Sequence, residues 1–386
     1  MSNLENLYRE RVKRIVTTAV HKEPDHVPVL HVAETWNLDY AGVKAVDVQG
    51  NMELEFESFC KPYEKIYCDG VLISCLTREI DIYNSLGGGA YFYSRDGVTI
   101  QHKEYVFMME DEYPKFIEDP MGFSLEEIFP RKFPELNKPY PENLEALKNS
   151  LASYTRFLNR LVKSGQYNKE KHGMPAIVSG TGQAPFDIIM DFFRGFKGIM
   201  TDMRRRPTEL AEACDALVPI MMATIQQGKT SLEPYPLVFF PLHAPTYLST
   251  KQFEELYWPS FRKVLYKTAE LGGKAIIALE GDWSHLYDFV NDFPKDFAIA
   301  MIEADDIFKV KDIIGKTVAL SGGIDLSMLR TATKQECLDR VKKVVDYCAP
   351  GGGFIFSTDK GLIAPGDVNI ENYAAVTEFV HTYGQY

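Results

Sequence analysis

The sequence predicts an α/β fold, a closed (β/α)8 or TIM barrel, from three observations. Residues 272–283 hold a short apolar run, Ala275–Leu279, between a glycine pair and two carboxylates. Seven other stretches repeat this order of apolar run, polar residues and helical pattern. A length of 386 residues suits one such barrel with insertions. The strands are expected at residues 27–32, 70–74, 176–178, 237–240, 275–279, 297–302, 318–320 and 353–356.

Two segments are added to the eight strand–helix units. Residues 1–22 have helical periodicity and predict an N-terminal helix that closes the bottom of the barrel or packs against a neighbour. Residues 85–141 form an insertion over the mouth, in which period-two stretches around Asp96-Gly97 predict a hairpin lid over residues 90–109. The rest of this insertion is rich in proline and predicts an irregular connection. We expect residues 1–386 to form a single barrel domain.

Composition argues against several classes of protein. The net charge of −12 disfavours nucleic acid as a partner, because phosphate binding needs a basic surface. No apolar run approaches the roughly 20 residues that span a membrane, and the first residues lack the apolar core of a signal peptide. We therefore expect a cytoplasmic protein without membrane contact. The six cysteines include no CxxC pair, so free thiols are expected.

Ionisable side chains collect where the predicted strands end, at the active-site face of such a barrel. Carboxylates crowded into one concave region repel each other and lose hydration, so several should be protonated, metal-bound or paired with Lys360. Asp325 and Asp306 are expected to cap the helices that follow them. The complete set is His31, Glu34, His243, Glu280, Asp282, Glu303, Asp305, Asp325, Asp359 and Lys360.

Glu280 is the expected centre of this group. It ends an apolar strand without being an obvious helix cap, and its ionised form needs a partner, for which His243 on the neighbouring strand is the candidate. His243 and Glu280, with Asp359 or Glu303, could also bind zinc through nitrogen and oxygen ligands. No HExxH motif or cysteine cluster marks such a site, so zinc is one alternative among the protonated and paired states.

Three segments carry a resemblance to a known family. The opening segment EPDHVPV, the SGGID after the seventh strand and the final GGGFIFSTDKGLIAPGDVNIENYAAVTEFVHTYG resemble the uroporphyrinogen decarboxylase superfamily, in the order that this family shows them. The resemblance covers nearly the whole chain from Glu23 and implies a (β/α)8 barrel. The superfamily includes the haem-pathway decarboxylase and cobalamin-dependent methyltransferases, which pass methyl groups through a corrinoid protein.

Two members of the superfamily fit this chain poorly. The decarboxylases use an arginine-rich segment after the first strand and a Gly-His-Gly near the last, whereas residues 31–38 contain no arginine and Asp359-Lys360-Gly361 stands at the second position. Porphyrinogen decarboxylation is therefore disfavoured. The coenzyme M methyltransferases bind zinc through a His-x-Cys after the fifth strand and a cysteine after the eighth, and this chain has neither. A thiol acceptor is disfavoured because hard oxygen groups replace the soft ligands.

The resemblance that remains is to the methyltransferase I component of aryl methyl ether O-demethylases. It implies transfer of a methyl group from a methoxylated aromatic to cobalt(I) of a partner corrinoid protein. A leaving phenolate has a free pKa near 10 and needs an acid, an imidazolium or a metal, roles that Glu280, His243 and Asp359 offer. The side chains expected to bind substrate are His31, Glu34, Trp36, Asp282, Glu303 and Lys360.

Two other functions stay open. An acidic mouth with Trp36, Trp283 and lid tyrosines could hold a methylated ammonium through charge and cation–π contact. The other reading is a barrel that only binds a ligand or scaffolds a partner, although dense ionisable residues at the strand ends argue against it. The oligomeric state is open as well, with a homodimer as one expectation.

Overall fold

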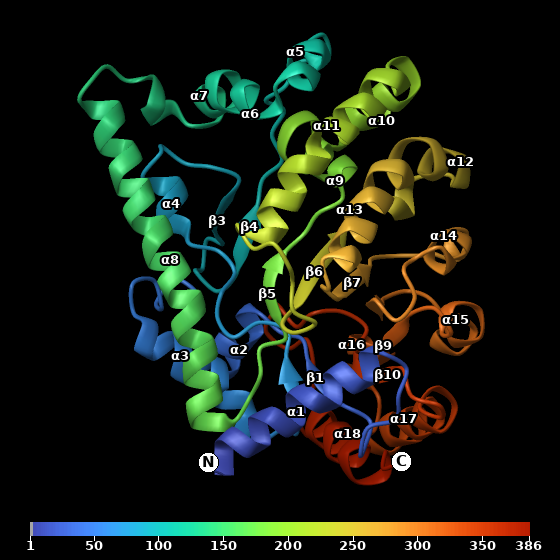
Figure 1. The fold of residues 1–386 in the computed structure, drawn as a ribbon. Helices are drawn as coiled ribbons and strands as arrows, with labels where there is room; N and C mark the ends of the chain where they lie inside the picture. Colours follow the sequence, from blue (N-terminus) through green and yellow to red (C-terminus); the bar gives the residue numbers. More distant parts are fainter. Residues whose placement is uncertain (1–2) are drawn as a thin grey trace.

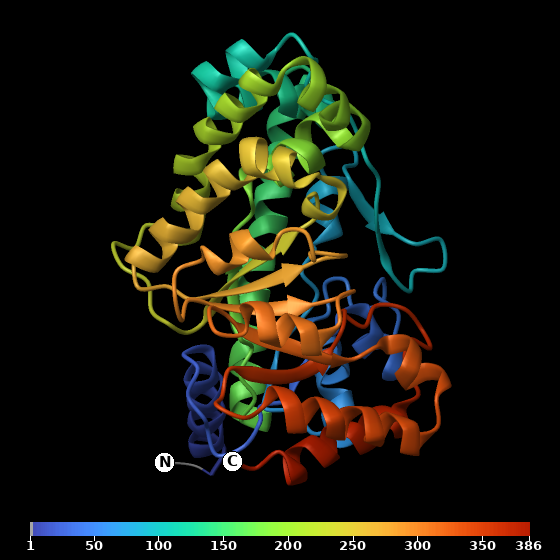
Figure 2. The same ribbon diagram turned by 90° about the vertical axis from the view of Figure 1, so that its right-hand side faces the viewer.

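The computed structural model describes residues 3–386. Eight parallel strands close into a barrel, and helices surround it (Figures 1 and 2). Six strands form one sheet in the order β10-β9-β8-β7-β6-β5, and β1 pairs with β2. Parallel bridges from Val29 to Phe356 and from Val71 to Ala176 join this pair to both edges of the sheet. The predicted fold class is thus confirmed. The barrel strands are β1 (Leu30–His31), β2 (Gly70–Val71), β5 (Val178–Thr181), β6 (Leu237–Leu242), β7 (Ala275–Leu279), β8 (Ala298–Ile302), β9 (Ala319–Ile324) and β10 (Phe354–Thr358).

The observed strands overlap all eight predicted windows but differ in length. β7 coincides with its window, whereas β9 continues through Ser321, Gly322 and Gly323, residues that the sequence reading placed after the strand. Backbone hydrogen bonds define a ladder, so small polar residues can extend it. β1 begins late in its predicted window because Pro28 has no N–H to donate to a ladder and the N–H of Val29 donates to the carboxylate of Asp69.

Helices surround the barrel, and most follow a strand in sequence (Figure 1). The α-helices are α1 (Asn3–Ala19), α2 (Thr35–Tyr40), α3 (Met52–Cys60), α4 (Ile80–Asn84), α5 (Tyr113–Glu118), α6 (Pro120–Phe123), α7 (Phe129–Lys132), α8 (Glu142–His172), α9 (Pro185–Ile189), α10 (Gly195–Arg205), α11 (Pro207–Gln226), α12 (Thr250–Gln252), α13 (Trp258–Glu270), α14 (Tyr287–Asn291), α15 (Ile307–Ile314), α16 (Leu326–Thr331), α17 (Lys334–Cys348) and α18 (Ile370–Tyr383). The 3-10 helices are η1 (Lys61–Glu64), η3 (Pro134–Asn137) and η5 (Pro245–Tyr247), and the π-helical turns are η2 (Ser124–Ile128), η4 (Met190–Arg194) and η6 (Phe253–Tyr257).

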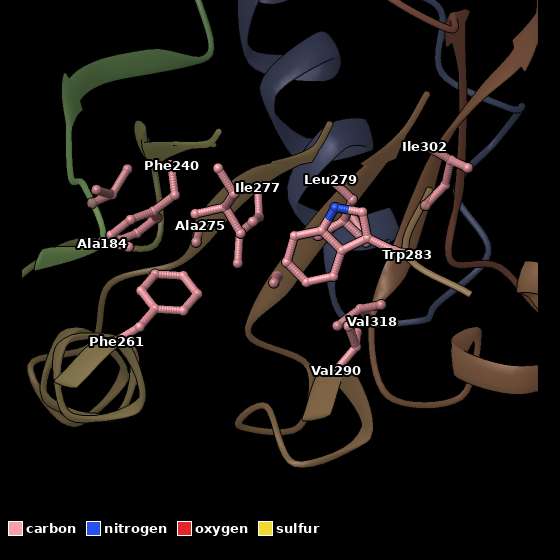
Figure 3. Close-up of a cluster of buried hydrophobic side chains, with 14 of the residues drawn as sticks. Ala184, Phe240, Phe261, Ala275, Ile277, Leu279, Trp283, Val290, Ile302 and Val318 are labelled. Atoms are coloured by element: carbon pink, nitrogen blue, oxygen red, sulfur yellow. The ribbon is translucent and has the colours of Figure 1, made fainter. Parts of the chain in front are cut away.

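Alternating side chains divide the core into two layers. Ile276 of β7 lies in the barrel interior, where Ile15 and Ala19 of α1 also pack, so the N-terminal helix closes the bottom as expected. Ala275 and Ile277 belong to the outer layer between the strands and the helices (Figure 3). Successive residues of a strand face opposite sides, so this division fixes which side chains beyond each strand end point into the mouth.

The inserted segment contains the predicted hairpin. Its strands, β3 (Tyr91–Tyr93) and β4 (Ile100–His102), are antiparallel. The expectation of an irregular connection after it is wrong, because residues 113–137 form the short helices α5, α6, η2, α7 and η3. Prolines stand in the first turns of α5, α6, α7 and η3, where the missing N–H has no intrahelical partner to lose. A proline-rich composition is thus compatible with short helices as well as with an irregular connection.

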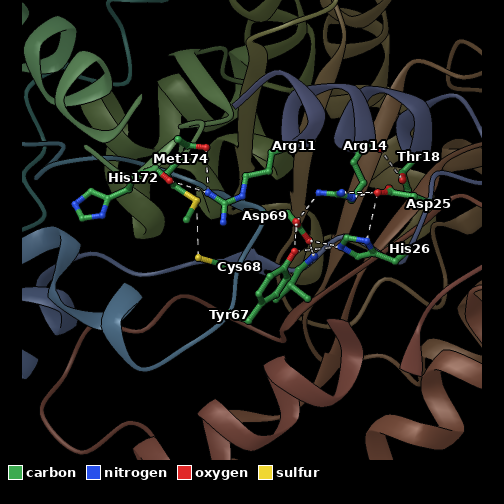
Figure 4. A network of polar contacts seen from close by, with 12 residues as sticks. Arg11, Arg14, Thr18, Asp25, His26, Tyr67, Cys68, Asp69, His172 and Met174 are labelled. Atoms are coloured by element: carbon green, nitrogen blue, oxygen red, sulfur yellow. Dashed lines mark hydrogen bonds and ion pairs between the residues drawn. The ribbon is translucent and has the colours of Figure 1, made fainter. Parts of the chain in front are cut away.

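A buried polar network ties α1 to the strand entrances at the bottom of the barrel (Figure 4). The guanidinium of Arg14 donates to both carboxylate oxygens of Asp25, at 2.7 and 2.6 Å, and to Asp69 at 2.7 Å. Asp69 is fully buried and also accepts the N–H of Val29 at 2.9 Å and the hydroxyl of Tyr67 at 2.7 Å. Every oxygen of the Asp69 carboxylate therefore has a donor.

Two further expectations bear on the whole chain. The six cysteines are free and buried, as predicted. Within residues 3–386, no helix combines the length and the apolar character needed to cross a bilayer.

Candidate active site

Three ionisable side chains extend the inward-facing rows of neighbouring strands. Ile276 lies inside the barrel, so Glu280, four residues later, points into the mouth, and the same count from Ile299 leads to Glu303. His243 follows β6, which lies beside β7. The structure thus brings together His243, Glu280 and Glu303, as the sequence predicted.

His243 has carboxylates near both ring nitrogens. Its Nδ1 lies 2.7 Å from Oδ2 of Asp191, and its Nε2 lies 3.7 Å from Oε1 of Glu280. Burial favours the neutral ring, but the hydrogen bond to Asp191 and the charges of Asp191, Glu280 and Asp187 outweigh it and raise the pKa of His243 to about 9. At neutral pH this residue is an imidazolium whose Nε2–H is directed toward Glu280.

Asp187 and Asp191 also lie at the candidate site, and the sequence analysis does not include them. Asp187 is fully buried and accepts the backbone N–H groups of His243 and Ala244, at 3.2 and 3.0 Å, and the hydroxyl of Tyr257 at 2.8 Å. Burial raises the pKa of its carboxyl to about 7. Asp191 lies one turn later, in the π-helical turn η4, a feature frequent at functional sites.

A sequence signal for these two residues did exist. The helix after a barrel strand begins at the mouth, so the first turn of α9 faces it, and Asp187 and Asp191 are four residues apart on one helical face. The sequence reading assigned this stretch only as a helix.

Glu303 and Lys360 form an ion pair at the mouth. The Nζ of Lys360 lies 2.9 Å from Oε1 of Glu303, and Oε2 accepts the N–H of Gly281 at 3.0 Å. The hydrogen bond that Lys360 donates to Glu303 raises the pKa of Lys360. The expected pairing of Lys360 with a mouth carboxylate is confirmed. Burial raises the pKa of Glu280, the nearby charges of Glu303 and Asp191 add to this effect, and the charge of His243 opposes it.

Other mouth carboxylates bind backbone groups. Asp306 caps α15 by accepting an N–H of its first turn at 3.1 Å, as predicted. Asp325 occupies the N-cap position of α16 but makes no capping hydrogen bond to the described backbone of that helix. Instead, Oδ1 of Asp359 accepts the N–H of Leu326 at 3.0 Å and that of Lys360 at 2.9 Å. The cap predicted for Asp325 is thus supplied by Asp359, because the end of β10 lies beside the start of α16.

His31 and Trp36 lie in the core and not at the mouth, where the sequence placed them. The ring nitrogens of His31 lie 2.9 Å from the hydroxyl of Tyr373 and 2.9 Å from Oδ1 of Asn37. Burial lowers the pKa of His31 to about 4, so the ring is neutral. Trp36 is buried and stacks on Tyr40. The chain turns into α2 directly after the short β1, so Trp36 lies on this helix and His31 is enclosed between α2 and Tyr373 of α18.

Glu34 and Asp282, which the sequence also predicted to bind substrate, form hydrogen bonds with loop residues. Oε1 of Glu34 lies 2.5 Å from the hydroxyl of Thr77 and joins the loops after β1 and β2. Asp282 is exposed at the strand end and accepts the N–H of Ser284 at 2.8 Å. Trp283 is fully buried, and its Nε1 donates to the carbonyl of Glu280 at 3.1 Å. Trp283 therefore supports the strand end that carries Glu280.

The hairpin lies against the site. The centre of the Tyr91 ring lies 4.6 Å from the guanidinium of Arg78 and 5.0 Å from the ring of His102. Burial lowers the pKa of His102, while the charge of Asp191 opposes this shift. The carboxylate of Glu104 accepts the N–H of Phe196 at the start of α10. The hairpin is thus fastened beside the helix segment that carries Asp191.

The donor set does not fit zinc. Within residues 3–386, no group of three or more His, Cys, Asp or Glu side chains is arranged to hold a metal ion. His243 and Glu280 supply two groups, whereas protein zinc sites use three or four. The Nδ1 of His243 is bound to Asp191, so only Nε2 of this ring could take a metal.

A hollow of about 730 Å³ lies at the opposite end of the barrel, between the end of α1 and the loops that precede β8, β9 and β10. Its lining includes His21, Lys22 and Lys311. The site at His243 is at the carboxyl ends of the strands, where barrel enzymes carry out their chemistry, so this hollow is not part of it.

Comparisons with known proteins agree with the fold. The family model for uroporphyrinogen decarboxylase (URO-D) matches residues 116–383. The comparison with curated proteins gives no match. Among solved structures, the chain is similar to a methyltransferase from Methanosarcina mazei, with a TM-score of 0.65 and 13% identity over 96% of this chain and 98% of that one. The family model covers more than half of the chain, and the chain therefore belongs to the uroporphyrinogen decarboxylase family.

Proposed function

We propose that this protein is a methyltransferase that takes the methyl group of a methoxylated aromatic and passes it to the corrinoid of a partner protein. The observation that carries the proposal is the charged His243, held by Asp191 at the mouth of the barrel with its Nε2–H free of a close acceptor. The fold shared with a methyltransferase of the same architecture supports it.

The chemistry requires a proton donor for the leaving oxygen. When bound, the corrinoid supplies a cobalt(I) nucleophile that accepts the methyl group. As the methyl–oxygen bond breaks, the aryl oxygen keeps the bonding electron pair and takes the proton from Nε2 of His243, which becomes neutral. A phenol with a pKa near 10 and a donor with a pKa of about 9 are well matched for this transfer.

Two carboxylates position His243, the proton donor. Asp191 accepts Nδ1–H and so directs Nε2–H toward the mouth, and Asp187 holds the backbone of His243 and Ala244. The side chains of His243 and Glu280 remain 38% and 41% exposed, so a large planar group carried by a second protein has access to them. The proton donor is therefore accessible from solvent.

The two alternative substrates, a porphyrinogen and a methylated ammonium, receive less support. A polycarboxylate porphyrinogen would meet Glu280 and Asp191, while Lys360 is already paired with Glu303. A methylated ammonium would be attracted to these charges, and the lid tyrosines are half-buried, but the two tryptophans expected beside them, Trp36 and Trp283, are 3% and 0% exposed. The ether is the donor for which the imidazolium has a chemical role.

One assay separates these functions. The protein is mixed with a reduced corrinoid protein and either a methoxyphenol or a methylated amine, and the cobalt(I) spectrum is followed. We expect conversion to methylcobalt(III) with the ether and none with the amine. Conversion with the amine alone would contradict the proposal and identify a methyltransferase for methylated amines. A broad donor panel without any transfer would identify a binding or scaffold barrel.

The variant Glu280→Gln tests which residue is the acid. Because the donor His243 remains, we expect methyl transfer to fall by less than about 10²-fold, the lower bound for loss of a general acid. The melting temperature should stay unchanged or rise, since one carboxylate leaves an acidic cluster. Asp282→Asn, which removes an exposed carboxylate with no contact to His243, is the control and should be fully active. A loss as large as that of a His243 variant would make Glu280 the acid.

A further inference from the structure

The outer face of α8 carries a row of large apolar side chains that solvent reaches. These six residues, here called the α8 row, are 38% to 56% exposed: Leu144, Leu147, Leu151, Tyr154, Leu158 and Leu161. α8 is 31 residues long and runs along the edge of the molecule (Figure 1). Single exposed apolar residues are ordinary, but a continuous row of this kind marks an interaction surface.

The two faces of α8 are the reverse of those of an ordinary surface helix. Such a helix turns its large apolar residues toward the core and its polar residues toward water. The buried side chains of α8 are small or polar, and most of its large apolar side chains are exposed, with Phe157 and Tyr167 half-buried. The buried set is Ala146, Ser150, Ser153, Arg160, Ser164 and Asn168. Packing within the monomer therefore does not explain why the residues of the α8 row are apolar.

The spacing of the α8 row identifies the kind of partner. Its members follow each other at alternating intervals of three and four residues, which is the a/d pattern of a coiled coil. The row spans 18 residues, or roughly 27 Å at 1.5 Å per residue. Such a seam is complementary to another helix that carries the same pattern.

We propose that α8 packs against α8 of a second copy of this chain, antiparallel, about a two-fold axis that passes between residues 152 and 153. This axis places Leu144 against the partner's Leu161 and Leu147 against the partner's Leu158. Leu151 then meets the partner's Tyr154 at the centre. Every member of the row faces another apolar side chain, as an isologous interface requires.

The helix dipoles support the antiparallel direction. Antiparallel helices set the positive N-terminus of one copy beside the negative C-terminus of the other, whereas a parallel pair brings like ends together. The side-chain charges do not decide the direction, because Glu142, Glu145, Arg156 and Lys163 lie on the side of α8 that faces away from the row. The row thus fits a second copy better than an unrelated helix, and the inference does not depend on the proposed reaction.

Sedimentation velocity of the full chain at micromolar concentrations tests the interface. We expect a dimer for the unchanged chain, and Leu151→Glu or Leu158→Glu should weaken it by at least about 30-fold, the loss typical of an interface hot spot. Both sites are exposed and glutamate favours helix, so the fold should persist, which a thermal melt checks. Ala152→Glu, exposed on α8 outside the row, is the matched control and should remain a dimer. A monomeric unchanged chain, or dimers that survive both row variants, would overturn the proposal.

Cysteine cross-linking tests the direction. The native cysteines are buried, so a cysteine placed in the α8 row is the accessible thiol. Oxidation should link Leu144→Cys to Leu161→Cys only when the two variants are mixed. Links within either variant alone would indicate a parallel pair and contradict the antiparallel interface. A corrinoid protein that protects these thiols in place of a second copy would also overturn it.

Discussion

Replacement of His243 by glutamine should lower the rate of methyl transfer by about 10²–10⁴-fold, the range for loss of a general acid. The glutamine amide can still donate to Asp191 and fill the space, but it has no acidic proton for the leaving oxygen. Single-turnover transfer from a methoxyphenol measures the chemical step. His285→Gln, which removes an exposed imidazole bound to the carbonyl of Leu248, is the control and should retain the rate.

The pH profile gives this prediction a second readout. The imidazolium is the active form, so the rate should be constant below its pKa and fall as pH rises through about 9. In Asp191→Asn the strongest hydrogen-bonding charge is gone, and the alkaline limb should move down toward 6.5, the ordinary pKa of histidine. An alkaline limb that stays at the same pH in this variant would remove His243 from the role of acid.

Replacement of Arg14 by alanine should lower the free energy of unfolding by about 3–5 kcal/mol, the usual effect of removing one partner from a buried ion pair. Asp69 is fully buried beside it and would keep its charge with only Tyr67, Val29 and His26 as partners. Denaturant unfolding measures the change. This network joins α1 to the entrances of β1 and β2. Its loss should therefore weaken the packing of α1 against the bottom of the barrel.

The control for Arg14 lies on the same helix. Arg9 forms an exposed pair with Glu5, and Arg9→Ala should cost less than about 1 kcal/mol. Equal effects of the two variants would contradict the importance of the buried network.

The dependence of stability on acid pH tests the same network. The hydrogen bonds from Arg14 lower the pKa of Asp25 from 3.8 to about 2, although burial opposes the shift. The stability from Asp25 is present above pH 4 and should be lost as pH falls toward 2, and Arg14→Ala should reduce this loss.

The sequence by itself determined the barrel and the composition of its mouth. Eight apolar runs followed by polar residues leave few alternatives, because parallel strands must bury both faces and end at one side of the barrel. The period of two along β6, β7 and β8 then places His243, Glu280 and Glu303 on the inward side. The nearness of His243 to Glu280 and the pairing of Lys360 with a mouth carboxylate follow from this placement.

Only the tertiary structure decided which of these groups are available for chemistry. His31 stands at a strand end like His243, but α2 covers it, whereas His243 stays partly open and meets Asp191 from another helix. Asp359 in place of Asp325 binds the first turn of α16 because two distant segments meet there. Periodicity is a property of one segment, while burial, pKa and hydrogen-bond partners depend on the segments that cover it, and a single sequence does not specify those contacts.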